Sequence, residues 1–301
     1  MSDFVQQQNS VCNFSHSDSW IILSPIEQSI KRKIEKVGTP LKDWDIQINY
    51  GIKIGFNEAF IISTEKREEI LANCQTEEEQ TRTAELIRPI LRGRDIKRYG
   101  YVDNGLFLIN THNGIRNKLP RIDINDYPAV KTHLDQYWDR ISTRADKGDT
   151  PYNLRNCAYL EDFSKPKVVY MEIQTDNPEE GYPFPCYSYD DNRCIVLNTA
   201  YIMSSETTDP RYVLGILNSR LGKFLVKLYV TQLQERQFRM LSQYVMKFPI
   251  AHSTKEQENE MIHLVQDVLV HQSLASEKRI DNLAFQIYGL TEIEIKSLIS
   301  R

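Results

Sequence analysis

The clearest chemical signal in this sequence is a cluster of arginine and lysine residues at positions 86–101. Within it, Arg92 and Arg94 flank a glycine, so the main chain could approach a phosphate while the two guanidinium groups reach further out. The segment carries five basic residues and one aspartate, whereas residues 64–85 carry seven glutamates and three basic residues. This segregation favours a local nucleic-acid contact. The alternative for either segment is an ordinary solvated face.

The loop 143–155 is a second basic and polar segment. Its basic side chains could reach phosphates, and two of its polar side chains could reach a base edge. The basic residues are Arg144, Lys147 and Arg155, and the two polar residues are Tyr152 and Asn153.

Composition limits the classes that remain. The 301 residues are 41% hydrophobic and 26% charged, with a net charge of −4. A small DNA-binding module is usually basic, so any nucleic-acid site here must be a local patch on an acidic body. The sequence has no run of about 18 apolar residues and no secretory signal pattern, which argues against a membrane protein. Five scattered cysteines without a C-x-x-C pair support neither a zinc site nor a disulfide framework, so we expect a cytoplasmic protein.

The elements that position the basic segments are expected to form an α+β fold. It would consist of a mixed, twisted β-sheet with flanking helices and a helical C-terminal tail. Around 45–62, alternating apolar residues predict a β-hairpin that turns at Gly55 and Asn57. Gly51, inside the first strand, marks a bulge or a close main-chain approach.

Further elements follow from periodicity and capping residues. Ser24 and Glu27 form a capping box for a helix to Val37, and Ser253 and Glu256 form one for a helix to about 275. Other helices are expected at 64–73, 129–141, 212–229, 280–288 and from 291 onward. Strands are expected at 20–23, 87–91, 105–110, 168–173, 182–189, 194–203 and 245–250.

We expect three parts along the chain. Residues 1–19 form a polar N-terminal linker, residues 20–252 the main domain, and residues 253–301 a C-terminal helical segment. The polar start indicates either an excised fragment or a naturally separate polypeptide.

Four phrases carry a resemblance to a known family. They are GIKIGFNEAFII at 51–62, LIRPILRGRDIKRYGY at 86–101, FSKPKVVYMEI at 163–173 and LGILNSRL at 214–221. Together they resemble the TaqI-like C-terminal specificity domain of type IIG restriction-modification enzymes and adenine-specific DNA methyltransferases, which is related to the type I specificity subunits. The resemblance runs from about Trp20 to the C-terminus. Ile54 and Ala251 replace the family's usual threonine and proline.

The resemblance implies sequence-specific recognition of double-stranded DNA for a bacterial N6-adenine methyltransferase. The domain would position the duplex for a methyltransferase catalytic domain supplied in cis or in trans. The expected DNA contacts are Lys53, Arg92, Arg94, Lys97, Arg98, Arg144, Lys147 and Arg155.

The catalytic motifs of such enzymes are not found in this sequence. It has no glycine-rich S-adenosylmethionine loop and no N-P-P-Y motif, because Asn177-Pro178-Glu179 lacks the aromatic residue. A nuclease site is not supported either, because Gln174 stands where a lysine would follow Glu172. We therefore expect no catalytic or metal-binding residues in this chain, and expect S-adenosylmethionine and Mg²⁺ only in the missing catalytic domains.

Two other classes remain open. The chain could be a protein-interaction module that docks through its C-terminal helices, or it could itself be the methyltransferase or endonuclease.

Overall fold

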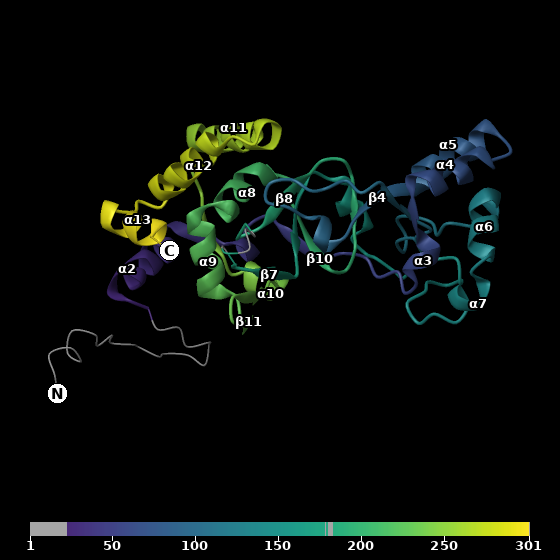
Figure 1. Ribbon diagram of the computed structural model, residues 1–301, viewed down its shortest axis with the longest axis horizontal. Coiled ribbons are helices and arrows are strands. Elements are labelled where there is room, and N and C mark those ends of the chain that lie inside the picture. Colours follow the sequence, from purple (N-terminus) through teal and green to yellow (C-terminus); the bar gives the residue numbers. More distant parts are fainter. Residues whose placement is uncertain (1–22, 178, 180–182, 301) are drawn as a thin grey trace. The chain divides into compact units, whose positions relative to one another are not determined.

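The computed structural model describes residues 23–177, 179 and 183–300 (Figure 1). The chain folds into two compact units built from interleaved segments. Unit 1 comprises Met1–Ile46, Ile173–Cys186 and Ser205–Arg301, and unit 2 comprises Gln47–Glu172 and Tyr187–Ser204. The sequence predicts a boundary at residue 252 between a main domain and a C-terminal segment, whereas unit 1 joins residues from both sides of that position. The linker at 1–19 and most of the strand at 20–23 lie outside the described residues.

Unit 2 is built on two four-stranded sheets. The first has the order β2 (Gln47–Tyr50), β10 (Ala200–Ser204), β6 (Lys167–Met171) and β8 (Tyr187–Asp190), and all its pairs are antiparallel. The second has the order β3 (Ile61–Ser63), β5 (Leu106–Ile109), β4 (Ile87–Leu91) and β9 (Ile195–Val196), and β4 and β9 are parallel. The helices are α3 (Asn57–Phe60), α4 (Thr64–Ala72), α5 (Glu77–Leu86), α6 (Pro128–Asp135) and α7 (Trp138–Ile141), with the 3₁₀ turns η2 (Gly93–Asp95), η3 (Ile124–Asp126) and η4 (Leu160–Ser164).

The predicted hairpin at 45–62 is wrong. β2 pairs with β10, whereas β3 pairs with β5, so the two strands lie in different sheets. The reason lies at Gly51, where an added Cβ would meet the carbonyl oxygen of Leu197 at 2.2 Å. The chain after β2 packs against the connection between β9 and β10, where Ile52 forms a parallel bridge with Leu197. The turn at Gly55 is present with φ +80°, but Asn57 begins the short helix α3.

Unit 1 contains two small sheets and most of the helices. β1 (Gly38–Pro40) pairs with β13 (Pro249–Ala251), and β12 (Gln237–Arg239) lies between β11 (Gln232–Gln234) and β7 (Ile173–Thr175). The helices are α2 (Pro25–Val37), α8 (Pro210–Asn218), α9 (Arg220–Tyr229), α10 (Ser242–Val245), α11 (Lys255–His271), α12 (Leu274–Ile287) and α13 (Glu292–Ile299), with the 3₁₀ turn η1 (Leu41–Asp43). The predicted capping box of Ser24 and Glu27 is confirmed.

Several predicted boundaries are wrong. The helix expected at 212–229 breaks at Ser219, which has extended backbone (ψ 170°) and caps α9 by accepting from the amide of Gly222. The expected helix 129–141 is likewise divided into α6 and α7. Thr254, not Ser253, caps α11, and the C-cap residue Gln272 is in the left-handed region with φ +51°.

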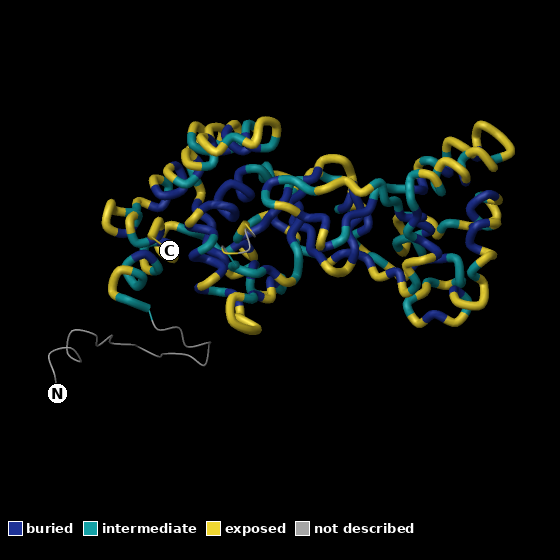
Figure 2. Tube along the Cα trace, in the orientation of Figure 1, coloured by how far each residue is buried: buried dark blue, intermediate teal, exposed yellow. Residues whose placement is uncertain are grey.

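Strands at 168–173, 182–189, 194–203 and 245–250 are shorter or divided in the structure, and Tyr182 lies outside the described residues. The observed fold is nevertheless α+β, with several sheets and flanking helices, as expected. Figure 2 shows buried chain along the strands of unit 2 and along α8 and α9 of unit 1.

Candidate nucleic-acid interface

The connection between β9 and β10 is the point where distant parts of unit 2 meet. The amide of Leu197 donates to the carbonyl of Leu91 at 2.8 Å, and the amide of Asn198 donates to the carbonyl of Ile52 at 3.1 Å. Asn198 and Thr199 are exposed. The segment after β2 and the segment after β4 therefore lie against one exposed polar turn.

The first basic group begins on η2, which is fixed by bonds on both sides. The guanidinium of Arg92 donates to the Asp95 carboxylate at 2.9 and 2.8 Å, and the amide of Gly93 donates to Thr199 Oγ1 at 2.9 Å. Burial raises the pKa of Asp95, but the bonds and charge of Arg92 outweigh it, and the net pKa is lowered. Gly93 is buried with its amide bonded, so it does not offer the expected main-chain approach to a phosphate. Arg94 is exposed.

Lys97 and Arg98 continue this group on a segment held to β8. The amide of Tyr99 donates to the carbonyl of Tyr187, and the amide of Tyr189 donates to the carbonyl of Tyr99, both at 2.7 Å. The Arg98 guanidinium lies over the Tyr99 ring, 5.1 Å from its centroid. Lys97 is exposed, and its Nζ donates to a main-chain carbonyl at 3.1 Å.

Arg144 in the second basic loop is buried and 7% exposed. Its guanidinium donates to the carbonyls of Ile54 at 2.8 Å, Asn153 at 2.5 Å and Pro151 at 3.2 Å. It also lies over the ring of Phe60, 4.2 Å from the centroid. Burial lowers the pKa of Arg144 to about 10. This side chain holds the loop together from inside.

The other basic residues of this loop are exposed. Lys147 Nζ donates to the carbonyl of Ser142 at 2.6 Å, and Arg155 pairs with Asp146 at 2.8 Å. Lys53 is exposed on the segment that follows β2. Lys147 and Arg155 can leave their present partners at small cost, because exposed interactions of this kind contribute about 0–1 kcal/mol.

The two polar residues that sequence reasoning assigned to base edges have internal partners. Asn153 is 1% exposed, donates to the carbonyl of Ile122 at 2.9 Å and accepts from Thr150 at 2.6 Å. The hydroxyl of Tyr152 donates to Asp135 at 2.5 Å. Both polar ends therefore take part in bonds within unit 2.

The structure thus separates the eight predicted contacts into two kinds. Arg92 and Arg144 fix their own turns, and Arg98 stacks on a tyrosine. The exposed cations are Lys53, Arg94, Lys97, Lys147 and Arg155. Sequence reasoning missed the turn at Asn198 and Thr199, although Gly51 marked the close approach that leads to it.

Within 23–177, 179 and 183–300, no group of three or more histidine, cysteine, aspartate or glutamate side chains could hold a metal ion. In the same residues, no helix combines the length and apolar character needed to cross a membrane.

Comparison with known proteins identifies the family. The model of the TaqI-like C-terminal specificity domain matches residues 88–250. The chain belongs to this family. The expected resemblance is confirmed, and with it the relation to restriction-modification enzymes.

The chain is also similar to a curated protein and to solved structures. The chain is 23% identical over 292 residues to the type II methyltransferase M.BstVI of Geobacillus stearothermophilus, covering 94% of this chain and 46% of that protein. The chain therefore spans about half the length of this curated relative. Its fold is similar to that of the type IIL restriction-modification enzyme MmeI, solved in complex with DNA, with TM-score 0.58 and 14% identity over 87% of this chain and 37% of MmeI. A weaker similarity, with TM-score 0.49 and 11% identity, links 88% of this chain to 34% of the type IIG restriction endonuclease BpuSI.

Proposed function

We propose that this chain is the DNA target-recognition part of a type IIG-like restriction-modification N6-adenine methyltransferase. It would position duplex DNA for a catalytic domain supplied in cis or in trans. The observation that carries the proposal is the match to the specificity domain across residues 88–250. This region contains both basic groups, and of the predicted contacts only Lys53 lies outside it.

The structure refines which residues make the contacts. We assign phosphate contacts to the exposed cations Lys53, Arg94, Lys97, Lys147 and Arg155, which gives a charge-driven and salt-dependent affinity. Arg92 and Arg144 hold the loops that carry them, and Arg98 lies over the ring of Tyr99. Asn198, on the exposed turn that lies against the segments after β2 and β4, presents a carboxamide of the kind that pairs with an adenine edge in the major groove.

S-adenosylmethionine and Mg²⁺ belong, in this proposal, to the catalytic domains and not to this chain. The partners are double-stranded DNA and the methyltransferase domain, in the cytoplasm. A methylation assay with the chain alone tests this division. Turnover of S-adenosylmethionine without added protein would favour the alternative that the chain is itself the enzyme.

The decisive experiment is selection of bound duplexes from a mixed-sequence library at low and moderate salt. We expect enrichment of a motif of several base pairs and an affinity that falls as salt rises. Salt-dependent binding without enrichment would mean that the catalytic domain is needed for specificity. No binding at low salt would refute DNA recognition by this chain.

A second candidate function, docking to the catalytic domain through the C-terminal helices, has support of its own. Val270, Leu274, Ile293 and Ile299 are 50–74% exposed on or beside α11–α13. These helices also pack within unit 1, because Met261 lies where an added Cβ on Gly215 would meet it at 2.4 Å. Deleting 253–301 would therefore expose core.

The sharper test replaces Val270, Leu274 and Ile293 with serine together. Loss of partner binding with unchanged DNA binding would support a docking surface. Retention of both would exclude these three side chains from docking.

A further inference from the structure

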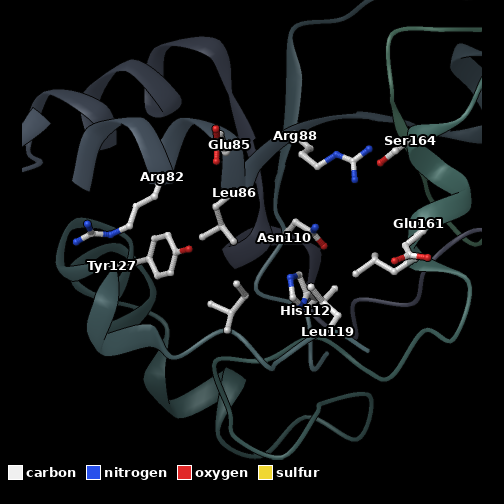
Figure 3. A pocket seen from close by; sticks show the side chains of 12 residues that line it. Arg82, Glu85, Leu86, Arg88, Asn110, His112, Leu119, Tyr127, Glu161 and Ser164 are labelled. Carbon is white, nitrogen blue, oxygen red and sulfur yellow. The ribbon is translucent and has the colours of Figure 1, made fainter. Parts of the chain in front are cut away.

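Unit 2 contains a pocket of about 280 Å³ that neither basic group uses (Figure 3). It lies among α5, the ends of β4 and β5, the loop at 112–127 and η4. Leu86, Leu119 and Ile122 form apolar walls, and the polar lining includes Asn110, Tyr127 and Arg88. The volume is just below the range of about 300–1,000 Å³ for pockets that hold drug-sized ligands, so a smaller molecule would fit.

Two polar groups in this pocket lack partners. Asn110 is 6% exposed, and its Oδ1 is buried without a hydrogen-bond donor. Such an atom is rare in folded proteins and indicates a missing partner. The Tyr127 hydroxyl points into the pocket in Figure 3 and has no hydrogen-bond partner among the described residues. Burial raises the pKa of Tyr127, so the hydroxyl is neutral and can donate.

Arg88 and His112 add donors to the lining of the pocket. The Arg88 guanidinium donates to the carbonyls of Arg193 at 2.5 Å and Phe163 at 3.4 Å, and no carboxylate of the described chain pairs with it. Burial, and then the charge of Arg88, lower the pKa of His112. The ring is therefore neutral, and Nδ1 accepts from the amide of Gly114 at 3.2 Å, which leaves the proton on Nε2 as a donor.

These features suit a flat, neutral group with donors and acceptors around its edge. Two arginines, Arg82 and Arg88, and two glutamates, Glu85 and Glu161, line the pocket, so their charges balance and favour a ligand without a net charge. A nucleobase has apolar faces for the leucine and isoleucine walls and an edge that pairs with a carboxamide, a hydroxyl and a guanidinium. We propose that this pocket binds a nucleobase that has left the stack of the bound DNA. The inference rests on the proposed function, because the DNA supplies the base.

The test compares binding of the full chain to matched duplexes with and without a central mismatch. A mismatched base leaves the stack more easily, so the chain should bind the mismatched duplex at least about tenfold more tightly. Asn110→Leu should abolish this preference and Tyr127→Phe should reduce it. Both should leave binding to the paired duplex within about twofold. Asn259→Leu, an exposed site on α11, is the matched control and should behave like wild type.

Equal binding to both duplexes by the wild-type chain, or a preference that survives both pocket variants, would overturn the inference while DNA recognition stands. If the chain binds no DNA, the proposed function fails. The pocket is then tested with the four deoxynucleosides by saturation-transfer NMR. Binding that Asn110→Leu removes would support a nucleobase site for free nucleosides, and absence of binding would overturn it.

Discussion

Two arginine sites that look alike in the sequence should respond in opposite ways to substitution. Arg144 makes three hydrogen bonds to carbonyls, of which those to Ile54 and Asn153 are buried. A hydrogen bond to a charged group contributes about 1.5–3 kcal/mol, so Arg144→Met should lower the free energy of unfolding by about 3–6 kcal/mol. The exposed pair Arg94→Ala and Lys97→Ala should change that free energy by less than about 0.5 kcal/mol.

DNA binding should show the reverse pattern. Each lost phosphate contact flattens the plot of log affinity against log salt by about 0.9, so the double variant of Arg94 and Lys97 should flatten it by about 1.8. Arg144→Met, measured where it is folded, should keep the wild-type slope. Lys278→Ala with Arg279→Ala, on the exposed surface of α12, makes the same change in net charge and should leave the slope unchanged.

The assays are urea denaturation for stability and fluorescence anisotropy at several salt concentrations for DNA binding. The reasoning is refuted if Arg144→Met is fully stable but flattens the salt dependence, because Arg144 would then leave its carbonyls to contact DNA. An unchanged slope in the double variant would remove Arg94 and Lys97 from the interface.

Three further outcomes are expected. Lys167 and its ion-pair partner Asp190 are both fully buried. Lys167→Met should lower the free energy of unfolding, measured in urea, by about 3–5 kcal/mol, because the Asp190 carboxylate is left buried and unpaired. A loss below about 1 kcal/mol would contradict this. Burial raises the pKa of Glu294, but bonds from Lys33 and from residues 29 and 291 outweigh it and lower the pKa to about 2, below its ordinary value of 4.5. The stabilisation by the Glu294 carboxylate is therefore complete above pH 4.5 and is lost as the pH falls toward 2. Over this range the free energy of unfolding of the wild type should fall by about 3 kcal/mol more than that of Glu294→Gln. Parallel pH profiles of the two proteins would exclude this contribution. Gly51→Ala should destabilise unit 2 by about 1–3 kcal/mol and weaken DNA binding, because the added Cβ would meet main-chain atoms. Gly100 has open space around it, so Gly100→Ala should do neither. Equal stability of the two variants would show that the close approach at Gly51 is not required.

Local sequence determined the features that depend on neighbouring residues. The capping box at Ser24 and Glu27 was predictable, because both partners lie within one helical turn. The turn at Gly55 followed from the tolerance of glycine for positive φ. The four family phrases predicted the specificity domain.

Only the tertiary structure decided which strands pair and which cations face solvent. β2 and β3 are neighbours in sequence but pair with strands from residues 200–204 and 106–109, so no local pattern could specify their partners. Arg144 and Lys147 lie in one loop and differ in burial because the carbonyl of Ile54, 90 residues away, accepts from the first. The burial of a charge depends on acceptors brought from elsewhere in the chain, and the one-dimensional sequence does not record their positions.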